Sequence, residues 1–187
     1  MVMDAHAEQI FKNLRLLADK LYKRNPHEWK KTGLPSREAA INKIFSKPFP
    51  SVNNKTSTDS IRLAFAEDYR GDRVLAFISG LGSMLTIAFN GKNDFYILDS
   101  LDAQKVHNSA RNIEIAAWLL RSRKKTNNQP YLLSYGKSPD GVNQSFERLI
   151  GKMIGLQDTL AQILAQKTHR VIKNVVQSAA QFVFLPV

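Results

Sequence analysis

The sequence of 187 residues contains no cysteine, and this absence excludes several kinds of site. Without thiolates the chain has no disulfide, no cysteine-ligated zinc or iron–sulfur centre and no cysteine nucleophile. Glycine and proline are also few, with 9 and 7 residues, which excludes a collagen-like chain or a long flexible linker. Hydrophobic residues make up 43% and charged residues 23%. This composition is typical of a globular chain, and we expect one domain over residues 1–187.

The motifs of common catalytic and cofactor sites are missing as well. The histidines, His6, His27, His107 and His169, are not spaced as a metal-binding pair on a helix, and no H-E-x-x-H occurs. Gly80-Leu81-Gly82 lacks the third glycine and the preceding strand of a dinucleotide site. Neither a phosphate-binding G-x-x-x-x-G-K nor a G-x-S-x-G nucleophile elbow is present. The sequence therefore predicts no catalytic residue, no metal site and no cofactor.

Positive charge is in excess, with a formal net charge of +11. The excess lies in the first and last thirds of the chain, while the middle third is nearly neutral. A solvated face explains such charge, but a basic domain is also drawn to nucleic acid or to an anionic membrane surface. The residues that would form a binding patch are Arg121, Arg123, Lys124, Lys125, Lys167, Arg170 and Lys173.

The most informative segment is Val74–Phe89, sixteen consecutive residues without a charge. A membrane span needs about 20 apolar residues, and this segment also contains serine, threonine and glycine. A helix that is apolar on every side has to be surrounded by other helices or by lipid. We expect it to be the central helix of a bundle, with Gly80 and Gly82 allowing a neighbouring helix to approach closely.

Amphipathic helices are predicted around this segment, so the fold class is all-α. Their apolar residues recur every three or four positions, near residues 4–24, 36–46, 58–69, 100–123 and 143–181, with loops at 51–59 and 124–142. Residues 95–98 fit either an extended segment or a helical turn.

Several residues are expected to begin, end or pack these helices. Asn25 before a proline, and Thr58 or Asp59, are candidate N-caps. Gly71 fits a left-handed helix end, and Asp72 fits the N-cap of the central helix. Gly151 and Gly155, four residues apart, suggest close packing between helices.

A polar cluster on the helix predicted at 100–123 is the strongest candidate for chemistry. Its members are Asn108, Arg111, Asn112 and Glu114, and Asp68 is placed to approach from the preceding helix. A catalytic or substrate site would need carboxylates converging in a cleft. An ion-pair network that fixes helix register is the interpretation we favour, since one helix rarely builds a catalytic site alone.

The end of the chain, residues 174–187, has no charged side chain. A segment that completes the core and an exposed apolar strip for a partner or a membrane both fit this composition. We expect the final segment, residues 182–187, to dock against the bundle.

Three segments resemble a family of uncharacterised exported proteins of proteobacteria, many of which look like cell-envelope lipoproteins. They are IRLAFAEDYRGDRVLAFISGL (61–81), FYILDSLDAQKVHNSARNIEIAAWL (95–119) and THRVIKNVVQSAAQFVFLPV (168–187). The resemblance implies a periplasmic or membrane-anchored location and carries no catalytic residue. Because Met1-Val2-Met3-Asp4 contains no apolar leader and no lipidated cysteine, we expect this chain to be the mature portion of such a protein; otherwise it is cytoplasmic.

Three functional hypotheses follow from these observations. The first is a non-enzymatic helical envelope protein that binds a protein partner or an anionic membrane surface. The second is a cytoplasmic nucleic-acid-binding protein that uses the basic ends, although no known nucleic-acid motif is visible. The third is a small-molecule carrier or an enzyme, with a pocket beside the central helix and the Asn108–Trp118 face.

Overall fold

The protein is an all-α helical bundle, as the sequence predicts. The computed structural model describes residues 2–91, 101–134, 137–138, 141–142, 144–168, 172 and 183–187. Its helices are α1 (Val2–Arg24), α2 (Pro26–Lys30), α3 (Arg37–Ile44), α4 (Ser57–Leu63), α5 (Arg73–Ala88), α6 (Ala103–Ser122) and α7 (Ser145–Thr168). Strands β1 (Lys137–Ser138) and β2 (Gly141–Val142) form a two-residue antiparallel pair between α6 and α7.

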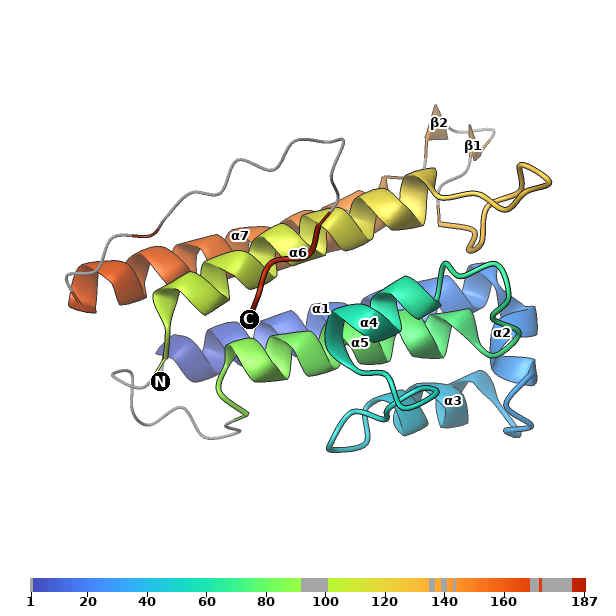
Figure 1. Ribbon diagram of the computed structural model, residues 1–187, viewed down its shortest axis with the longest axis horizontal. Helices are drawn as coiled ribbons and strands as arrows, with labels where there is room; N and C mark the ends of the chain where they lie inside the picture. Colours follow the sequence, from blue (N-terminus) through green and yellow to red (C-terminus); the bar gives the residue numbers. More distant parts are fainter. Residues whose placement is uncertain are drawn as a thin grey trace.

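The helices form two groups that meet at the long helix α1. Figure 1 shows α6 and α7 lying side by side as an antiparallel pair, with α4 and α5 forming a second pair and α3 on its outer side. Helix α1 contacts both α7 and α5, so it joins the two groups into one hydrophobic core. This arrangement places the start of α1 and the end of α5 near each other (Figure 1).

Helix α5 is the buried centre that the uncharged segment predicts. It contacts α1, α2, α3, α4 and α6, and its residues Val74, Ala76, Ile78, Met84 and Leu85 are completely buried. The protein's own helices therefore cover most of the apolar surface that would otherwise need lipid, and Ile87, near the end of α5, remains 40% exposed. Within the residues that the structure describes, none of the helices combines the length and hydrophobicity that crossing a membrane requires.

Asp72 begins α5, and it lies in a buried polar network. Its Oδ1 accepts hydrogen bonds from the backbone N–H groups of Val74 (2.9 Å) and Leu75 (3.0 Å), which confirms the predicted N-cap. Its Oδ2 accepts a hydrogen bond from the Tyr22 hydroxyl of α1 at 2.6 Å. Burial raises the pKa of Asp72, and burial together with this carboxylate raises the pKa of Tyr22. The network ties α1 to the first turn of the central helix.

Helix α4 is shorter than the predicted helix at 58–69, because Arg73 binds the chain that follows it. The buried guanidinium of Arg73 donates hydrogen bonds to the carbonyl oxygens of Ala64, Ala66 and Tyr69. These bonds satisfy carbonyl groups that would otherwise remain unpaired beyond the end of a helix. Arg73, which lies on α5, thereby stabilises a turn after α4, where the spacing of apolar residues predicts that the helix continues.

The predicted caps at Thr58 and Asp59 are wrong, because α4 begins earlier. Thr56 occupies the N-cap position without a side-chain cap bond, and Ser57 has a left-handed φ of 51°. The N–H of Ser57 donates instead to Ser83 Oγ of α5 at 2.7 Å. The loop predicted at 51–59 is correspondingly shorter and contains a backbone bridge between Val52 and Lys55.

Two other predictions about local structure are only partly right or wrong. Asn25 occupies the N-cap position of α2 and Pro26 begins the helix, as predicted, but the Asn25 side chain makes no capping bond. It bonds the backbone of Leu21 and Leu133 instead, which ties the end of α1 to the segment after α6. Gly71 was predicted to be left-handed, but it is not among the described glycines with positive φ. Because glycine has no side chain, this position leaves room for the Tyr69 ring. Tertiary contacts decide the conformation in both cases.

Gly151 and Gly155 of α7 do not mark a close helix contact among the described residues. A Cβ atom at either position would meet no atom within 4 Å, and both residues are exposed. Gly80 of α5, in contrast, lies against α4: a Cβ there would approach the Ile61 nitrogen and the Ser57 oxygen to 2.8 Å each. The expected close approach therefore occurs on α5 and not on α7.

Part of the predicted secondary structure lies outside the described residues. The helix predicted at 143–181 is confirmed over Ser145–Thr168, and residues 169–171 and 173–182 are not described. The undecided segment at 95–98 also falls outside the description.

Candidate ligand-binding groove

Two residues of the predicted polar cluster hold the end of the chain. Asn108 Nδ2 donates a hydrogen bond to the Pro186 carbonyl at 2.8 Å. The Asn112 side chain makes two bonds to Leu185, donating to its carbonyl at 2.8 Å and accepting from its N–H at 2.6 Å. Because both amides are used by the backbone of this segment, Asn108 and Asn112 have a structural role.

The segment 183–187 lies across α6, as expected for a docked end (Figure 1). Its Phe184 side chain is buried, and the guanidinium of Arg62 on α4 lies 5.0 Å from the centre of that ring. The segment therefore contacts both groups of helices, and docking is confirmed for its described residues.

The charged residues of the cluster form ion pairs between α6 and α7. Arg111 Nη2 lies 2.6 Å from Asp158 Oδ2 and 3.2 Å from Glu114 Oε1. His107 Nδ1 is 3.7 Å from Asp158 Oδ1. Burial and the nearby Arg111 lower the pKa of His107, and burial raises the pKa of Glu114. A cavity of about 360 Å³ adjoins these groups among the described residues. The arrangement of paired charges fits an ion-pair network that fixes helix register.

Asp68 does not join this cluster. It is exposed in the turn after α4. Its neighbour Glu67 is bound by the Tyr131 hydroxyl, in the segment after α6. The structure thus divides the predicted cluster into a pair of asparagines, an interhelical ion-pair network and a separate exposed carboxylate.

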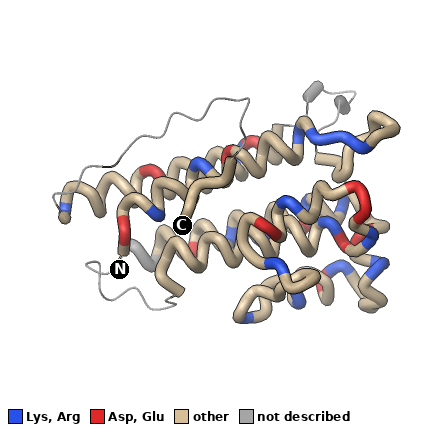
Figure 2. Tube along the Cα trace, viewed as in Figure 1, with Lys and Arg blue, Asp and Glu red and all other residues tan. Residues whose placement is uncertain are grey.

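The predicted basic patch is not one surface in the described part of the chain. Arg121 lies in the last turn of α6, 3.7 Å from Glu147 at the start of α7, and Arg123, Lys124 and Lys125 follow the helix. Lys167 is in the last turn of α7. Because α6 and α7 are antiparallel, about 20 residues of helix, or roughly 30 Å, separate the two ends. Basic positions accordingly occur at both ends of this pair (Figure 2), and Arg170 and Lys173 lie outside the described residues.

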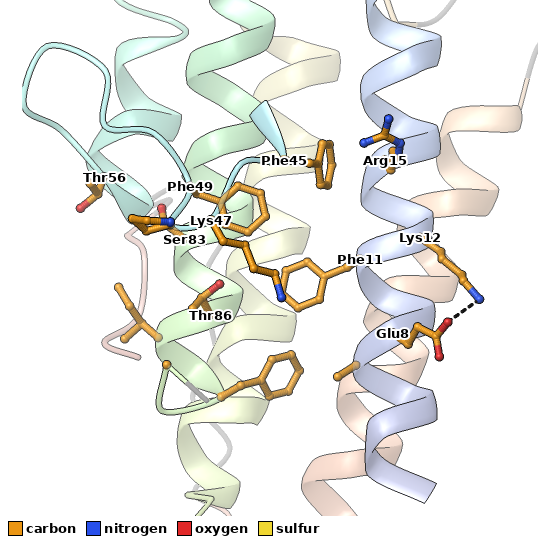
Figure 3. Close-up of a pocket in the computed structure, with 15 residues that line it drawn as sticks. Glu8, Phe11, Lys12, Arg15, Phe45, Lys47, Phe49, Thr56, Ser83 and Thr86 are labelled. Atoms are coloured by element: carbon orange, nitrogen blue, oxygen red, sulfur yellow. Dashed lines mark ion pairs between the residues drawn. The ribbon is translucent and has the colours of Figure 1, made fainter. Parts of the chain in front are cut away.

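A much larger hollow lies on the other side of the molecule, between α1, α5 and the segment that joins α3 to α4. It is an open groove of about 1000 Å³. Helix α1 contributes one wall, the second half of α5 contributes the floor, and residues 45–49 form the opposite wall (Figure 3). The volume is at the upper end of the range of small-molecule sites, roughly 300–1000 Å³.

Aromatic side chains line one side of this groove. Phe11 of α1 stacks on Phe49 with ring centres 5.9 Å apart, and Phe45 meets Phe49 edge to face at 5.6 Å. Phe89, at the end of α5, lies edge to face with Phe11 at 6.3 Å. The distances are typical of favourable aromatic pairs. Phe11, Phe45 and Phe49 are half-buried and form the accessible apolar wall, whereas the Phe89 ring is only 1% exposed and supports Phe11 within the core.

The floor of the groove depends on Gly82. A Cβ atom at this position would collide with the Phe49 ring, so only glycine lets that ring lie directly on α5. Beside it, Ser83 Oγ donates to the Ser79 carbonyl at 2.8 Å and Thr86 Oγ1 donates to the Gly82 carbonyl at 2.9 Å. Each hydroxyl proton is therefore used within the helix, and the hydroxyl oxygens are the polar feature of the floor.

Basic side chains surround this apolar wall. Lys12, Arg15 and Lys47 line the groove together with a single carboxylate, Glu8, whose Oε1 lies 2.7 Å from Lys12 Nζ. The guanidinium of Arg15 lies 5.4 Å from the centre of the Phe45 ring. Figure 3 shows Lys47 running into the groove toward Phe11. Arg15 is in turn paired with Glu38 of α3, at 2.8 Å, so two of the three basic side chains at the groove already have carboxylate partners.

The described lining residues offer an apolar surface and charged side chains that can contact a ligand. The lining residues include no histidine, and Glu8 is held by Lys12 at the exposed rim. Ser83 has no adjacent base among them, so it lacks the activation that a serine nucleophile requires. Among the described residues, histidines and carboxylates form no group of three or more that would hold a metal ion.

Sequence reasoning did not find this groove. Phe11, Phe45 and Phe49 are not adjacent in the chain, and Phe45 fits the pattern of a core residue in an amphipathic helix. The one available signal was Lys47-Pro48-Phe49-Pro50, which places an aromatic residue and a cation in a proline-flanked segment. The third functional hypothesis placed a pocket between the central helix and the Asn108–Trp118 face, whereas this groove lies between α5, α1 and the segment after α3.

Comparison with known proteins gives no further assignment, because no family model, curated protein or solved structure matches the chain.

Proposed function

We propose that this protein is a non-enzymatic binding protein that holds a small molecule with an apolar body in the groove between α1 and α5. The observation that carries the proposal is the groove of about 1000 Å³ that is lined by the half-buried rings of Phe11, Phe45 and Phe49. Ligand sites are commonly concave and apolar with a few polar groups that fix orientation. The proposal agrees with the first hypothesis from the sequence in describing a non-enzymatic binding protein. It differs in the ligand, which is a small molecule instead of a protein partner or a membrane surface.

The size of the groove sets the expected affinity. A ligand with about twenty non-hydrogen atoms, at roughly 0.3 kcal/mol per atom, gains about 6 kcal/mol on binding. This free energy corresponds to a dissociation constant of tens of micromolar. A binding assay therefore has to cover the range from about one micromolar to a few hundred.

The test uses a neutral apolar fluorophore, N-phenyl-1-naphthylamine, whose emission rises in an apolar site. We expect saturable binding to the wild-type protein. Thr86→Phe places a ring on the floor of the groove, and we expect it to weaken binding at least tenfold. The matched control is Thr159→Phe, the same substitution at an exposed position of α7, which we expect to bind as the wild type does.

Two results would contradict the proposal. The first is the absence of saturable binding by the wild type. The second is equal binding by Thr86→Phe and the wild type, because it would place the probe elsewhere on the surface. Circular dichroism of each variant verifies that the helices are intact.

We also propose a location in the bacterial envelope, and this rests only on the family resemblance of residues 61–81, 95–119 and 168–187. Fractionation of cells that express the natural gene tests the location, and a purely cytosolic signal would reject it. The outcome does not affect the groove, because its binding depends on the folded chain alone.

A further inference from the structure

The charged side chains at the groove are largely paired within the protein, and this bears on the charge of its ligand. Glu8 Oε1 lies 2.7 Å from Lys12 Nζ, and Arg15 Nη2 lies 2.8 Å from Glu38 Oε1. Arg15 Nη2 also donates a hydrogen bond to Asn42 Oδ1 at 2.5 Å. Each ion pair has no net charge, and a charged ligand would have to compete with the partner that is already present.

Lys47 is the other charged side chain among the described residues that line the groove, and it is exposed. Water and salt ions screen an exposed ammonium group, so it adds little affinity for an anion. An ion that moved from water onto the apolar wall would lose its hydration without a strong partner in exchange. The charges at the groove therefore favour a ligand that has no charge of its own.

The floor of the groove offers a polar atom that can accept a hydrogen bond. Thr86 is half-buried on the α5 side of the groove, opposite α1 (Figure 3), and its hydroxyl donates to the Gly82 carbonyl at 2.9 Å. A hydroxyl oxygen can also accept, and among the contacts of the described residues Thr86 Oγ1 accepts no hydrogen bond. The neighbouring Ser83 Oγ differs, because the N–H of Ser57 already donates to it at 2.7 Å.

We propose that the ligand of this groove is an uncharged molecule whose apolar body lies on Phe11, Phe45 and Phe49 and whose hydroxyl or amide N–H donates a hydrogen bond to Thr86 Oγ1. This inference rests on the proposed function, since it names the chemical class that the same groove takes. The paired charges at the rim support a ligand without charge, and the acceptor on the floor supports a ligand with a donor. A ligand without a donor would cover the Thr86 oxygen and remove its water contacts without replacing them.

The experiment compares naphthalene derivatives that differ in one group. At pH 7, 2-naphthol is uncharged and has a donor, 2-methoxynaphthalene is uncharged and has none, 2-naphthoic acid is an anion and 2-naphthylmethylamine is a cation. Each competes with N-phenyl-1-naphthylamine for the wild-type protein. We expect the anion and the cation to need concentrations at least tenfold higher than 2-naphthol to displace the probe, because both lose hydration in the groove.

Thr86→Val locates the hydrogen bond, because valine has nearly the same shape as threonine and has no acceptor. The measured quantity is the displacement concentration of 2-methoxynaphthalene divided by that of 2-naphthol, a ratio from which the affinity of the probe cancels. The ratio should fall by about two- to tenfold in Thr86→Val, the factor to which one neutral hydrogen bond corresponds. Thr159→Val, the same substitution at an exposed position of α7, should leave the ratio unchanged.

Thr86→Ser separates the loss of the acceptor from a general change in the groove. It keeps the hydroxyl, so its ratio should stay close to that of the wild type. A ratio as low as that of Thr86→Val would show that the hydroxyl is not the cause, and the inference would be overturned.

The possible failures are distinguishable. If the neutral probe binds but the ratio is the same in Thr86→Val and the wild type, the inference is wrong and the proposed function stands. The same holds if either ion displaces the probe at a concentration as low as 2-naphthol does. If the neutral probe does not bind to the wild type at all, the proposed function itself is wrong.

Discussion

The contact between Asp72 and Tyr22 gives a quantitative test of how the central helix is held. Asp72→Ala removes the cap from the N–H groups of Val74 and Leu75, which stabilises a helix by about 1 kcal/mol. The same substitution leaves the buried Tyr22 hydroxyl without its acceptor, which destabilises by about 1–3 kcal/mol. We therefore expect the free energy of unfolding to fall by about 2–4 kcal/mol.

A matched control is present in the same chain. Asp102 caps α6 through the N–H groups of Gln104 (2.8 Å) and Lys105 (3.4 Å), but it is only half-buried. Asp102→Ala should therefore destabilise by about 1 kcal/mol, the contribution of a cap alone. The difference between Asp72→Ala and Asp102→Ala isolates the effect of the buried hydroxyl.

Urea denaturation followed by far-ultraviolet circular dichroism measures these free energies by linear extrapolation. In a chain of this size about 1 kcal/mol shifts the melting temperature by about 2–4 °C, so Asp72→Ala should melt about 4–16 °C lower. Tyr22→Phe completes a double-mutant cycle, and in that background the cost of Asp72→Ala should fall toward that of Asp102→Ala.

One result would refute this reasoning. If Asp72→Ala destabilises no more than Asp102→Ala, and costs the same whether or not Tyr22→Phe has removed the hydroxyl, then the buried contact does not stabilise α5. The claim that Asp72 caps α5 would still stand, but the claim that its contact with Tyr22 ties α1 to the central helix would be wrong.

Three further predictions follow from individual positions. Gly155→Ala, on the exposed face of α7, should raise the free energy of unfolding by about 0.5–1 kcal/mol, because alanine has the higher helix propensity. Gly80→Ala should lower the free energy of unfolding by about 1–2 kcal/mol, because the α4 backbone lies where the methyl group would be. Urea denaturation of the two variants tests both signs. Asn112→Ala should destabilise by about 1–3 kcal/mol, since it removes two hydrogen bonds to Leu185, and limited proteolysis should then cleave the final segment faster. Because the pKa of Asp72 is raised in the folded chain, the folded chain binds a proton at this carboxylate more tightly than the unfolded chain does. Protonation of Asp72 therefore contributes fully to stability below the ordinary carboxyl pKa of 3.8. This contribution is lost as the pH rises through the raised pKa of the folded chain. Relative to Asp72→Asn, the wild type should therefore be more stable at the acid end of a pH series of denaturation curves, and a constant difference across the series would contradict this.

The helices themselves were largely predictable, because their signals are local. The spacing of Ile10, Leu14, Leu17 and Leu21 places an apolar stripe on one face of α1, and all four residues are completely buried. Asp72 was the expected cap of the central helix, and its side chain caps it. In each case a pattern within a few residues decides the conformation.

The candidate sites were less predictable, because their meaning depends on what lies opposite. Asn108, Arg111 and Asn112 share a helix, yet the asparagines meet the last residues of the chain and the arginine meets α7. Sequence spacing shows which side chains share a face, but it does not show which element covers that face. The interpretation of the cluster as structural fits these contacts, while Asp68 lies elsewhere.

The sequence by itself determined that residues 74–89 form a helix without a charged face, which other helices have to cover over most of its surface. Only the tertiary structure decided that α4 ends at Leu63, where the Arg73 guanidinium binds the carbonyl groups that follow. It also decided that aromatic side chains from three separate segments meet beside α5 and leave an open groove. A local pattern fixes the conformation of a segment, whereas a groove arises from the relative placement of segments, which depends on long-range packing.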